Sequence, residues 1–171
     1  MTSGTRARMF IAALALCAPA TIARAVTPPT QATVNANIIH PLTVTKLKDM
    51  DFGYLAAATA GTAVLEPNAD AFSTTGGATA VGGTAHCAEF LGAAQSNAVV
   101  NIQVPKQPIT LTRVGGTETL TVSNFTLQGL SKRAIAKATS FTFRVGGTLN
   151  LPANPVEGTY VGTFSVTVQY P

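Results

Sequence analysis

The sequence has few charged residues, no tryptophan and only two cysteines among 171 residues. Because charged residues make up 11% of the chain, its composition is not that of a disordered charged tail. Its length and its low cysteine content also exclude a disulfide-rich mini-scaffold. Without tryptophan, the chain lacks the planar aromatic platform that many sugar-binding sites use. These absences leave an ordinary folded domain as the main possibility.

Motifs that carry catalysis or hold metals are missing as well. The chain contains no G-x-S-x-G, no H-E-x-x-H and no C-x-x-C sequence. Its two histidines, His40 and His86, lie far apart in the sequence and have no cluster of acidic residues near them. The sequence therefore predicts a protein that is not an enzyme and that binds no metal or cofactor.

The first 25 residues have the three parts of a secretory signal peptide. Arg6 and Arg8 precede an apolar stretch over residues 10–18, and cleavage is predicted after Ala25, at the end of Ala-Arg-Ala. The apolar stretch is too short for a membrane span, which needs about 20 residues. A lipid anchor at Cys17 is disfavoured, because the bulky Leu16 stands where a small residue is normal. We therefore expect a signal peptide over residues 1–25 and one secreted domain over residues 26–171, with no transmembrane span.

Removing this leader lowers the net charge of the chain and leaves it with one cysteine. The whole chain has a formal charge of +4, but the leader holds three of its eleven basic residues, so eight remain against seven acidic ones. The mature chain is thus nearly neutral, and nucleic acid is not its expected partner. Cys87 becomes the single thiol, which excludes an internal disulfide. We expect it to be buried and inert, with an intermolecular bridge or a reactive thiol as the alternatives.

The remaining sequence has the pattern of an all-β protein. It is rich in threonine and valine, and Gly-Gly pairs punctuate it at positions 76, 82, 115 and 146. Between the turns, apolar residues recur at every second position, as in residues 99–104, 109–112 and 140–145. The parity switches near residues 122–125, which predicts a β-bulge. The only stretch with helix-forming composition, residues 130–138, is short enough for a connecting turn. Seven or eight short antiparallel strands in a two-sheet sandwich are expected.

The last twelve residues before Pro171 alternate without interruption. The even positions are mostly apolar, and the odd positions are mostly threonine, serine or glutamine. This predicts one strand over residues 159–170 that lines the core along its length. The residues on its inward face, together with the glycine that precedes the strand, are Gly158, Tyr160, Gly162, Phe164, Val166, Val168 and Tyr170.

Two stretches carry a family resemblance. The ending GTLNLPANPVEGTYVGTFSVTVQYP resembles the C-terminal signature of bacterial pilin-like proteins, in which a glycine stands fourteenth from the end and a tyrosine is penultimate. Together with NIIHPLTVTKLKDMDFGYL, residues 37–55, it resembles more closely the bacterial domain of unknown function 4402 family. That family is related to spore coat protein U-like proteins and to chaperone-usher pilin subunits. The lack of a disulfide pair departs from many pilins.

The resemblance implies an immunoglobulin-like sandwich, complete or lacking one strand, in the periplasm or on the cell surface. In the incomplete case a periplasmic chaperone supplies the missing strand first, an outer-membrane usher follows, and a like or related subunit supplies it in the fibre. In chaperone-usher pilins the C-terminal features belong to the strand that the chaperone recognises, so the resemblance makes the face from Gly158 to Tyr170 the expected contact strand for a chaperone or subunit. Alternate residues near the mature N-terminus could be the donor, but the preferred interpretation is that they form the domain's own first strand. These residues are Ala32, Val34, Ala36 and Ile38.

Two functional classes therefore remain at this stage. The leading one is a non-enzymatic structural subunit of a bacterial surface fibre or coat, assembled by β-strand complementation. The alternative is a self-contained secreted binding module for a glycan or lipid head group of the cell envelope. The alternative would use the one basic cluster as an anion patch, although such a cluster is usually a solvated surface. The cluster consists of Lys132, Arg133 and Lys137.

Overall fold

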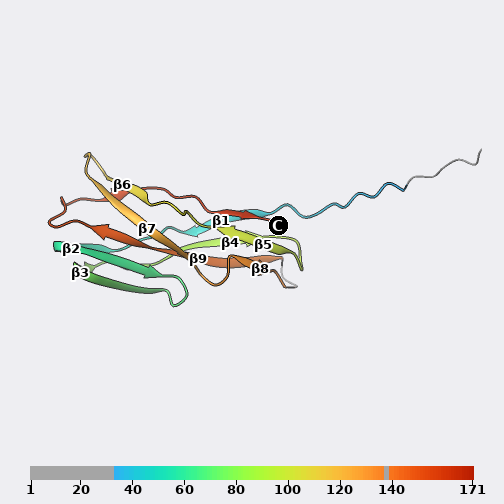
Figure 1. Ribbon diagram of the computed structural model, residues 1–171, viewed down its shortest axis with the longest axis horizontal. Helices are drawn as coiled ribbons and strands as arrows, with labels where there is room; N and C mark the ends of the chain where they lie inside the picture. The colour runs from blue at the N-terminus through green and yellow to red at the C-terminus, as the bar shows by residue number, and fades with distance from the viewer. Residues whose placement is uncertain (1–32, 137–138) are drawn as a thin grey trace, which may run out of the picture. The chain divides into compact units, whose positions relative to one another are not determined.

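The structure, a computed structural model, describes residues 33–136 and 139–171 (Figure 1). The described residues contain eleven strands and no helix, and all the strands lie in the unit Asn37–Pro171. The strands are β1 (Thr43–Lys48), β2 (Tyr54–Glu66), β3 (Ala71–Gly82), β4 (Ala88–Ala93), β5 (Val99–Gln103), β6 (Ile109–Arg113), β7 (Thr119–Leu127), β8 (Lys132–Ala134), β9 (Ser140–Leu151), β10 (Tyr160–Val161) and β11 (Thr167–Gln169).

The strands form two antiparallel sheets, which confirms the predicted all-β sandwich. The larger sheet has the order β1-β4-β9-β7-β6-β10, with the β2–β3 hairpin attached to β9, and the smaller has the order β11-β5-β8. The strand count exceeds the predicted seven or eight. One reason is that the predicted C-terminal strand is divided into β10 and β11, and another is that residues 130–138 contain β8 rather than a plain turn.

β9 organises the larger sheet because it pairs with three other strands. One edge pairs with β7, while the other pairs first with β4 and then, beyond Gly146, with β2. Gly146 makes this change of partner possible, since a Cβ there would lie only 2.1 Å from the carbonyl oxygen of Leu65. The predicted alternation of β9 is confirmed. Phe143 and Val145 are fully buried, whereas Thr142, on the opposite face of the strand, is exposed.

The core consists of two apolar clusters. The first contains Leu120, Val122, Leu149 and Leu151 together with small residues of the β2–β3 hairpin. The second is built around Phe143 and includes Val100, Ile102, Ile135 and Val145. The ring of Phe143 stacks against Phe90 with centroids 5.3 Å apart and against Phe141 with centroids 6.0 Å apart. Met50 and Phe125 pack against both clusters and so join them.

The predicted bulge near residues 122–125 is confirmed. The register of β7 against β9 shifts between Ser123 and Thr126, and Asn124 has a positive φ of 49°. Asparagine adopts this left-handed conformation more easily than most residues do. The extra residue moves the inward face from the even to the odd positions, which brings Phe125 onto the core.

The prediction that residues 32–38 form the domain's own first strand is wrong for the part that the structure describes. Residues 33–42 carry no strand, and β1 begins only at Thr43. Val34 and Ile38 are 91% and 94% exposed. Ala32 lies outside the described residues. Alternation is compatible with a strand, but residues 33–42 form none in the part of the chain that the structure describes.

Phe143 offers a test of the core. Replacing Phe143 by Ala should lower the free energy of unfolding by about 3–5 kcal/mol, because it removes a fully buried ring stacked between two others. Thr142→Ala, on the exposed face of the same strand, is the matched control and should change stability little. Urea unfolding measures both, and equal losses for the two variants would contradict this description of the core.

Candidate functional site

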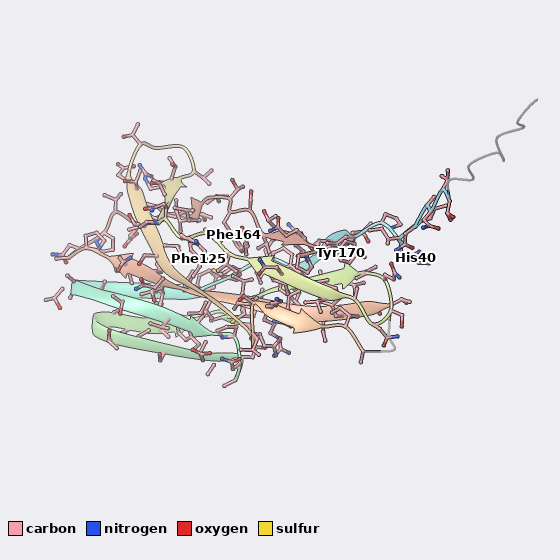
Figure 2. All side chains as sticks on the ribbon, turned by 45° about the vertical axis from the view of Figure 1, so that its right-hand side comes forward. His40, Phe125, Phe164 and Tyr170 are labelled. Atoms are coloured by element: carbon pink, nitrogen blue, oxygen red, sulfur yellow. The ribbon has the colours of Figure 1, made fainter. Side chains whose placement is uncertain are left out.

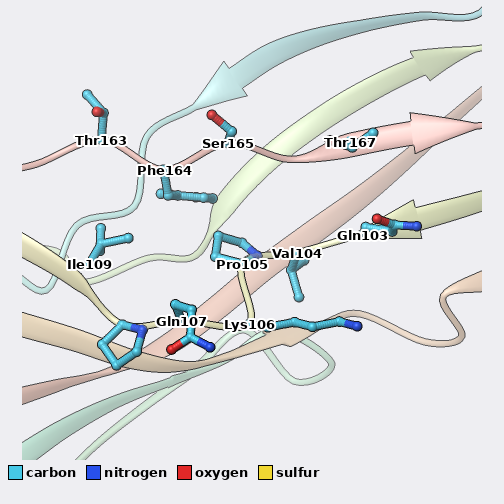
Figure 3. Close-up of a pocket in the computed structure, with 11 residues that line it drawn as sticks. Gln103, Val104, Pro105, Lys106, Gln107, Ile109, Thr163, Phe164, Ser165 and Thr167 are labelled. Carbon is cyan, nitrogen blue, oxygen red and sulfur yellow. The ribbon is translucent and has the colours of Figure 1, made fainter.

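The candidate site is an open edge between the first strand and the C-terminal segment. Among the described residues, β1 pairs only with β4, and β1 therefore ends its sheet. The C-terminal segment, residues 160–170, pairs along one edge only, through β10 with β6 and through β11 with β5. β1 and this segment lie side by side (Figures 1 and 3), yet no ladder of hydrogen bonds between described strands joins them. Two unpaired strand edges thus border the same surface.

The prediction of one unbroken strand over residues 159–170 needs correction. Residues 162–166 belong to no strand, although β10 precedes them and β11 follows them. In the register of β11, residues 164–166 run opposite the connection from β5 to β6, which contains Pro105 and Pro108, whereas in the register of β10 residues 162 and 163 run opposite Leu111 and Thr110 of β6. Because proline has no amide hydrogen, this connection cannot offer a regular ladder. The sheet pairing therefore breaks where the segment passes from the larger sheet to the smaller one.

The predicted side-chain alternation of this segment holds despite the break. The large even-numbered residues are half-buried, and all the odd-numbered residues from 159 to 169 are exposed. Tyr160 packs against the first core cluster, whereas Phe164 packs against the second. The ring centroid of Phe164 lies 5.2 Å from that of Phe125 and 6.2 Å from that of Phe90 (Figure 2). The other even-numbered residues of the segment that pack against the second cluster are Val166, Val168 and Tyr170.

Two hollows flank the unpaired stretch. The smaller one, about 140 Å³, lies between the end of β1, β4 and residues 162–164. Its apolar surface comes from Met50, Ala88, Phe90 and Phe164, and Lys46 and Asp49 stand at its margin, where they form an exposed ion pair of 2.5 Å. This hollow opens at the edge between β1 and the C-terminal segment. An apolar side chain from another strand could enter it.

The larger hollow, about 420 Å³, lies on the other side of Phe164 (Figure 3). It separates residues 163–167 from the β5–β6 connection, where the regular pairing is lost. Apolar side chains form part of its wall, and amide, hydroxyl and amino groups form the rest. The lining residues are Gln103, Val104, Pro105, Lys106, Gln107, Pro108, Ile109, Thr163, Phe164, Ser165 and Thr167.

The hydroxyl group of Tyr170 fastens the C-terminal end of this edge. It accepts a hydrogen bond of 2.9 Å from the backbone N–H of Gln95 and donates one of 3.2 Å to the backbone oxygen of His40. Figure 2 shows Tyr170 and His40 close together. His40 immediately precedes Pro41 and β1, so this tyrosine holds the end of the C-terminal segment beside the chain that enters β1. The C-terminal end of the open edge is thereby held in a defined position.

Gly158 has a different surrounding from the rest of the predicted contact strand. It has a φ of +145°, and a Cβ at this position would lie 2.8 Å from Cδ of Arg113. Arg113 in turn donates a 2.6 Å hydrogen bond from Nε to Oε2 of Glu118, which lowers the pKa of that carboxyl group. The absence of a side chain at Gly158 therefore lets the chain pass closely over Arg113 before β10 begins.

The residues of the predicted donor segment are open to solvent. Val34, Ala36 and Ile38 are all exposed, and none of them belongs to a strand. Because they share the same parity, an extended conformation would place all three side chains on one face. The segment thus presents apolar side chains and an unpaired backbone, which are what a strand needs in order to join another sheet.

The predicted anion patch is described only in part. Lys132 is exposed, but Lys137, like the predicted cleavage residue Ala25, lies outside the described residues. The guanidinium of Arg133 donates from Nε to the backbone oxygen of Leu130 at 3.0 Å and from a terminal nitrogen to that of Gln128. Its partial burial lowers its pKa. Two donors of the Arg133 guanidinium thus bind backbone oxygens of its own turn and stabilise that turn.

Cys87 is buried, as predicted, with only 2% of its surface exposed. Burial, reinforced by the nearby Asp70 carboxylate, raises the pKa of its thiol from 9.0 to about 12. His86 forms a backbone bridge with Asp51, and its Nδ1 lies 3.4 Å from the backbone oxygen of Cys87. A thiol with so high a pKa is a poor nucleophile at neutral pH.

The sequence pattern did not identify several residues of the open edge. Met50 and Phe90 line the smaller hollow, and the β5–β6 connection lines the larger one, although all of them are distant in sequence from residues 162–164. The alternation of residues 159–170 indicated which side chains face inward. It carried no signal for which strand edge would remain unpaired, because that depends on the neighbours in the fold.

The fold and the site define the chain as a two-sheet antiparallel β-sandwich with an open edge beside its last strand. A family model described as "Domain of unknown function (DUF4402)" matches residues 42–170, which include every strand. The chain belongs to this family. Comparisons with curated proteins and with solved structures find no significant match. Within the part of the chain that the structure describes, no helix is long and apolar enough to cross a membrane.

The role of Tyr170 is testable by removing its hydroxyl group. Tyr170→Phe keeps the ring but loses both hydrogen bonds, so it should lower the free energy of unfolding by about 1–2 kcal/mol. Tyr54→Phe is the control, because the Tyr54 side chain is 71% exposed and should tolerate the change. Chemical denaturation of both variants measures the difference. No loss for Tyr170→Phe would show that the hydroxyl group does not fasten this edge.

The buried thiol predicts a dependence of stability on alkaline pH. Between pH 9 and about 12 the unfolded chain loses the Cys87 proton while the folded chain keeps it, so stability should fall as pH rises. The advantage of the wild type over Cys87→Ala should therefore decline by up to about 1.4 kcal/mol per pH unit in this window. Denaturant titrations of both proteins from neutral pH to about pH 11 measure it. A constant difference would contradict the raised pKa.

Proposed function

We propose that the protein is a non-enzymatic structural subunit of a bacterial surface fibre or coat, assembled by β-strand complementation. The observation that carries this proposal is the open edge of residues 160–170, which packs half-buried apolar side chains next to unpaired backbone. The resemblance of its C-terminal sequence to bacterial pilin-like proteins supports the same role.

The open edge has the physical properties of an acceptor site. Strand addition provides main-chain hydrogen bonds along the edge, and alternate side chains of the incoming strand fill pockets. Here the smaller hollow lies at the edge between β1 and the C-terminal segment, and its surface includes Met50 and Phe90. An incoming strand would cover the half-exposed side of Phe164 and its even-numbered neighbours, which the domain itself leaves uncovered.

The N-terminal segment is the donor that this proposal assigns. Val34, Ala36 and Ile38 form an alternating apolar face that no strand of the described domain pairs with. Val34 and Ile38 would lie about 13 Å apart in an extended strand, at about 3.3 Å per residue. A neighbouring subunit would offer this segment to the open edge, and each subunit would in turn receive a segment from the next. Growth by this route is head-to-tail and therefore open-ended.

Secretion and assembly partners follow from the same proposal. The leader predicted over residues 1–25 would direct the chain out of the cytoplasm, and a periplasmic chaperone would cover the open edge until an outer-membrane usher passes the subunit into a fibre. An uncovered edge would otherwise promote aggregation. The competing function as an anion-binding module gains no support from Arg133, because two of its donors bind backbone oxygens.

A pair of charge substitutions tests the donor segment. Val34→Asp together with Ile38→Asp puts two carboxylates on the face that would be buried, so it should abolish polymer formation by residues 26–171. Asn35→Asp together with Asn37→Asp adds the same charge on the opposite face and is the matched control. Polymer length is measured by analytical ultracentrifugation after release from a matching chaperone.

A synthetic peptide of residues 32–40 distinguishes strand addition from other kinds of association. Excess peptide should cap the edge, end polymer growth and raise the free energy of unfolding, by about 2.7 kcal/mol at a hundredfold excess over its Kd. The doubly substituted peptide should have no effect. A wild-type chain that stays monomeric, is indifferent to the chaperone and is not stabilised by the peptide would refute the proposed function.

A further inference from the structure

The outer edge of β3 is a second free strand edge of the domain, far from the open edge described above. Among the described strands it pairs only with β2, and Figures 1 and 2 show it as an outer strand of the β2–β3 hairpin. Its twelve residues, AFSTTGGATAVG, include no charged residue and no proline. Soluble proteins normally protect such an edge with charges, prolines, short length or bulges. β3 lacks the first three of these protections.

The other strands that end a sheet in the described part of the chain are shorter or carry charge. β8 has three residues, and β10 and β11, with two and three residues, are short pieces of the C-terminal segment, whose open edge offers apolar side chains as well as backbone groups. β1 is longer but contains Lys46 and Lys48. The exposed edge of β3 therefore differs from these edges in both length and charge. β3 is thus the longest uncharged strand that ends a sheet in the described part of the chain.

The fourth protection, a bulge, occurs in the middle of β3 and near its C-terminal end, where the register shifts between Tyr54 and Leu55 of β2. The register against β2 shifts between Ala57 and Gly61, opposite Gly76, which has a φ of +66°. Residues 71–75 precede this irregularity and pair in unbroken register with residues 62–66 of β2. β2 is itself paired with β9 over residues 61–65, so this half of the hairpin has a strand behind it. Residues 71–75 thus form a regular, supported and neutral edge.

We propose that residues 71–75 pair antiparallel with the same residues of a second copy of this chain, about a two-fold axis at Ser73. An isologous contact of this kind needs a surface that is complementary to itself. In this register Ser73 faces Ser73 of the second copy, and Ala71 faces Thr75. The pairing joins two eight-stranded sheets into one continuous sheet.

The side chains on this edge suit a second copy. Ala71, Ser73 and Thr75 are all exposed, small and uncharged, so two copies meet without like-charge repulsion. The two Ser73 hydroxyl groups face each other in this register, and hydroxyl pairs across strands are favourable. The same sheet already contains one hydroxyl pair, the 2.6 Å hydrogen bond between Thr62 and Thr75. Asp70, the nearest acid, would face Gly76 of the second copy rather than another acid. Its carboxylate also lies 3.9 Å from Nε of Arg144.

This pairing is independent of the proposed strand complementation and uses a different edge. A two-fold contact closes on itself and stops at two copies, whereas strand donation continues without limit. If both operate, the two-fold contact links head-to-tail fibres side by side. If only the β3 contact operates, the protein is a dimer.

A cysteine at the two-fold axis tests the proposal. Directly opposite residues of an antiparallel pair have Cα atoms about 4.5–5.5 Å apart, which suits a disulfide. The purified Ser73→Cys protein, with diamide as the oxidant, should therefore form a covalent dimer, at a rate about tenfold or more above chance collision because pairing raises the effective concentration. Cys87 is buried and does not compete. Non-reducing electrophoresis follows the reaction.

Thr110→Cys is the matched control. Thr110 is also an exposed threonine of the larger sheet, but both edges of its strand β6 are covered there. One edge pairs with Thr121 of β7, and Gly162 lies against the other, since a Cβ at Gly162 would be 2.8 Å from the Thr110 backbone oxygen. Repeating the Ser73→Cys experiment with Val34→Asp and Ile38→Asp present removes the donor segment, and cross-linking should persist. Equal cross-linking rates for Ser73→Cys and Thr110→Cys would overturn the β3 contact, whatever the outcome for strand complementation. Loss of cross-linking with the donor substitutions would overturn it as well, because the contact would then depend on polymer formation.

Discussion

Backbone pairing around β9 is the constraint on which the rest of this sandwich depends. One long strand binds β7 along one edge and divides its other edge between β4 and β2. The division needs a position where another backbone can approach without a side chain in the way, and Gly146 provides it. From there the two core clusters follow, because Val145 belongs to one and Leu149 to the other. The β2–β3 hairpin, with its exposed outer edge, is also a consequence of this branching.

The two strand edges proposed for assembly differ in chemistry, and so do the roles proposed for them. Beside the C-terminal segment, apolar side chains such as Phe164 remain half-covered, so an incoming strand gains both hydrogen bonds and burial. Along residues 71–75 of β3 the exposed side chains are small and neutral, so pairing rests on the backbone and on hydroxyl contacts. The first edge suits a donated apolar segment, and the second suits an identical neutral strand. An assembly that uses both can grow along one direction and associate along another.

Periodicity predicted the parts of the structure that depend on one face meeting a core. The inward positions of β5 and β9, the bulge at Asn124 and the inward face of residues 160–170 were all visible in the sequence, because a strand exposes alternate side chains to opposite sides. The same periodicity led to the wrong conclusion for Val34 and Ile38. Alternation shows that a segment can be a strand, but it does not show that the domain contains a partner for it.

By itself, the sequence determined the all-β class, the burial of Cys87 and the faces of the strands, since these follow from local patterns of apolar residues and turns. Only the tertiary structure decided which edges stay open. Within the interruption at residues 162–166, residues 164–166 run opposite a connection that contains Pro105 and Pro108 and cannot offer a regular ladder. The link from Tyr170 to Gln95 and His40 likewise joins residues that are distant in the chain. Strand pairing is a non-local property, and so the surfaces proposed for assembly appear only once the chain has folded.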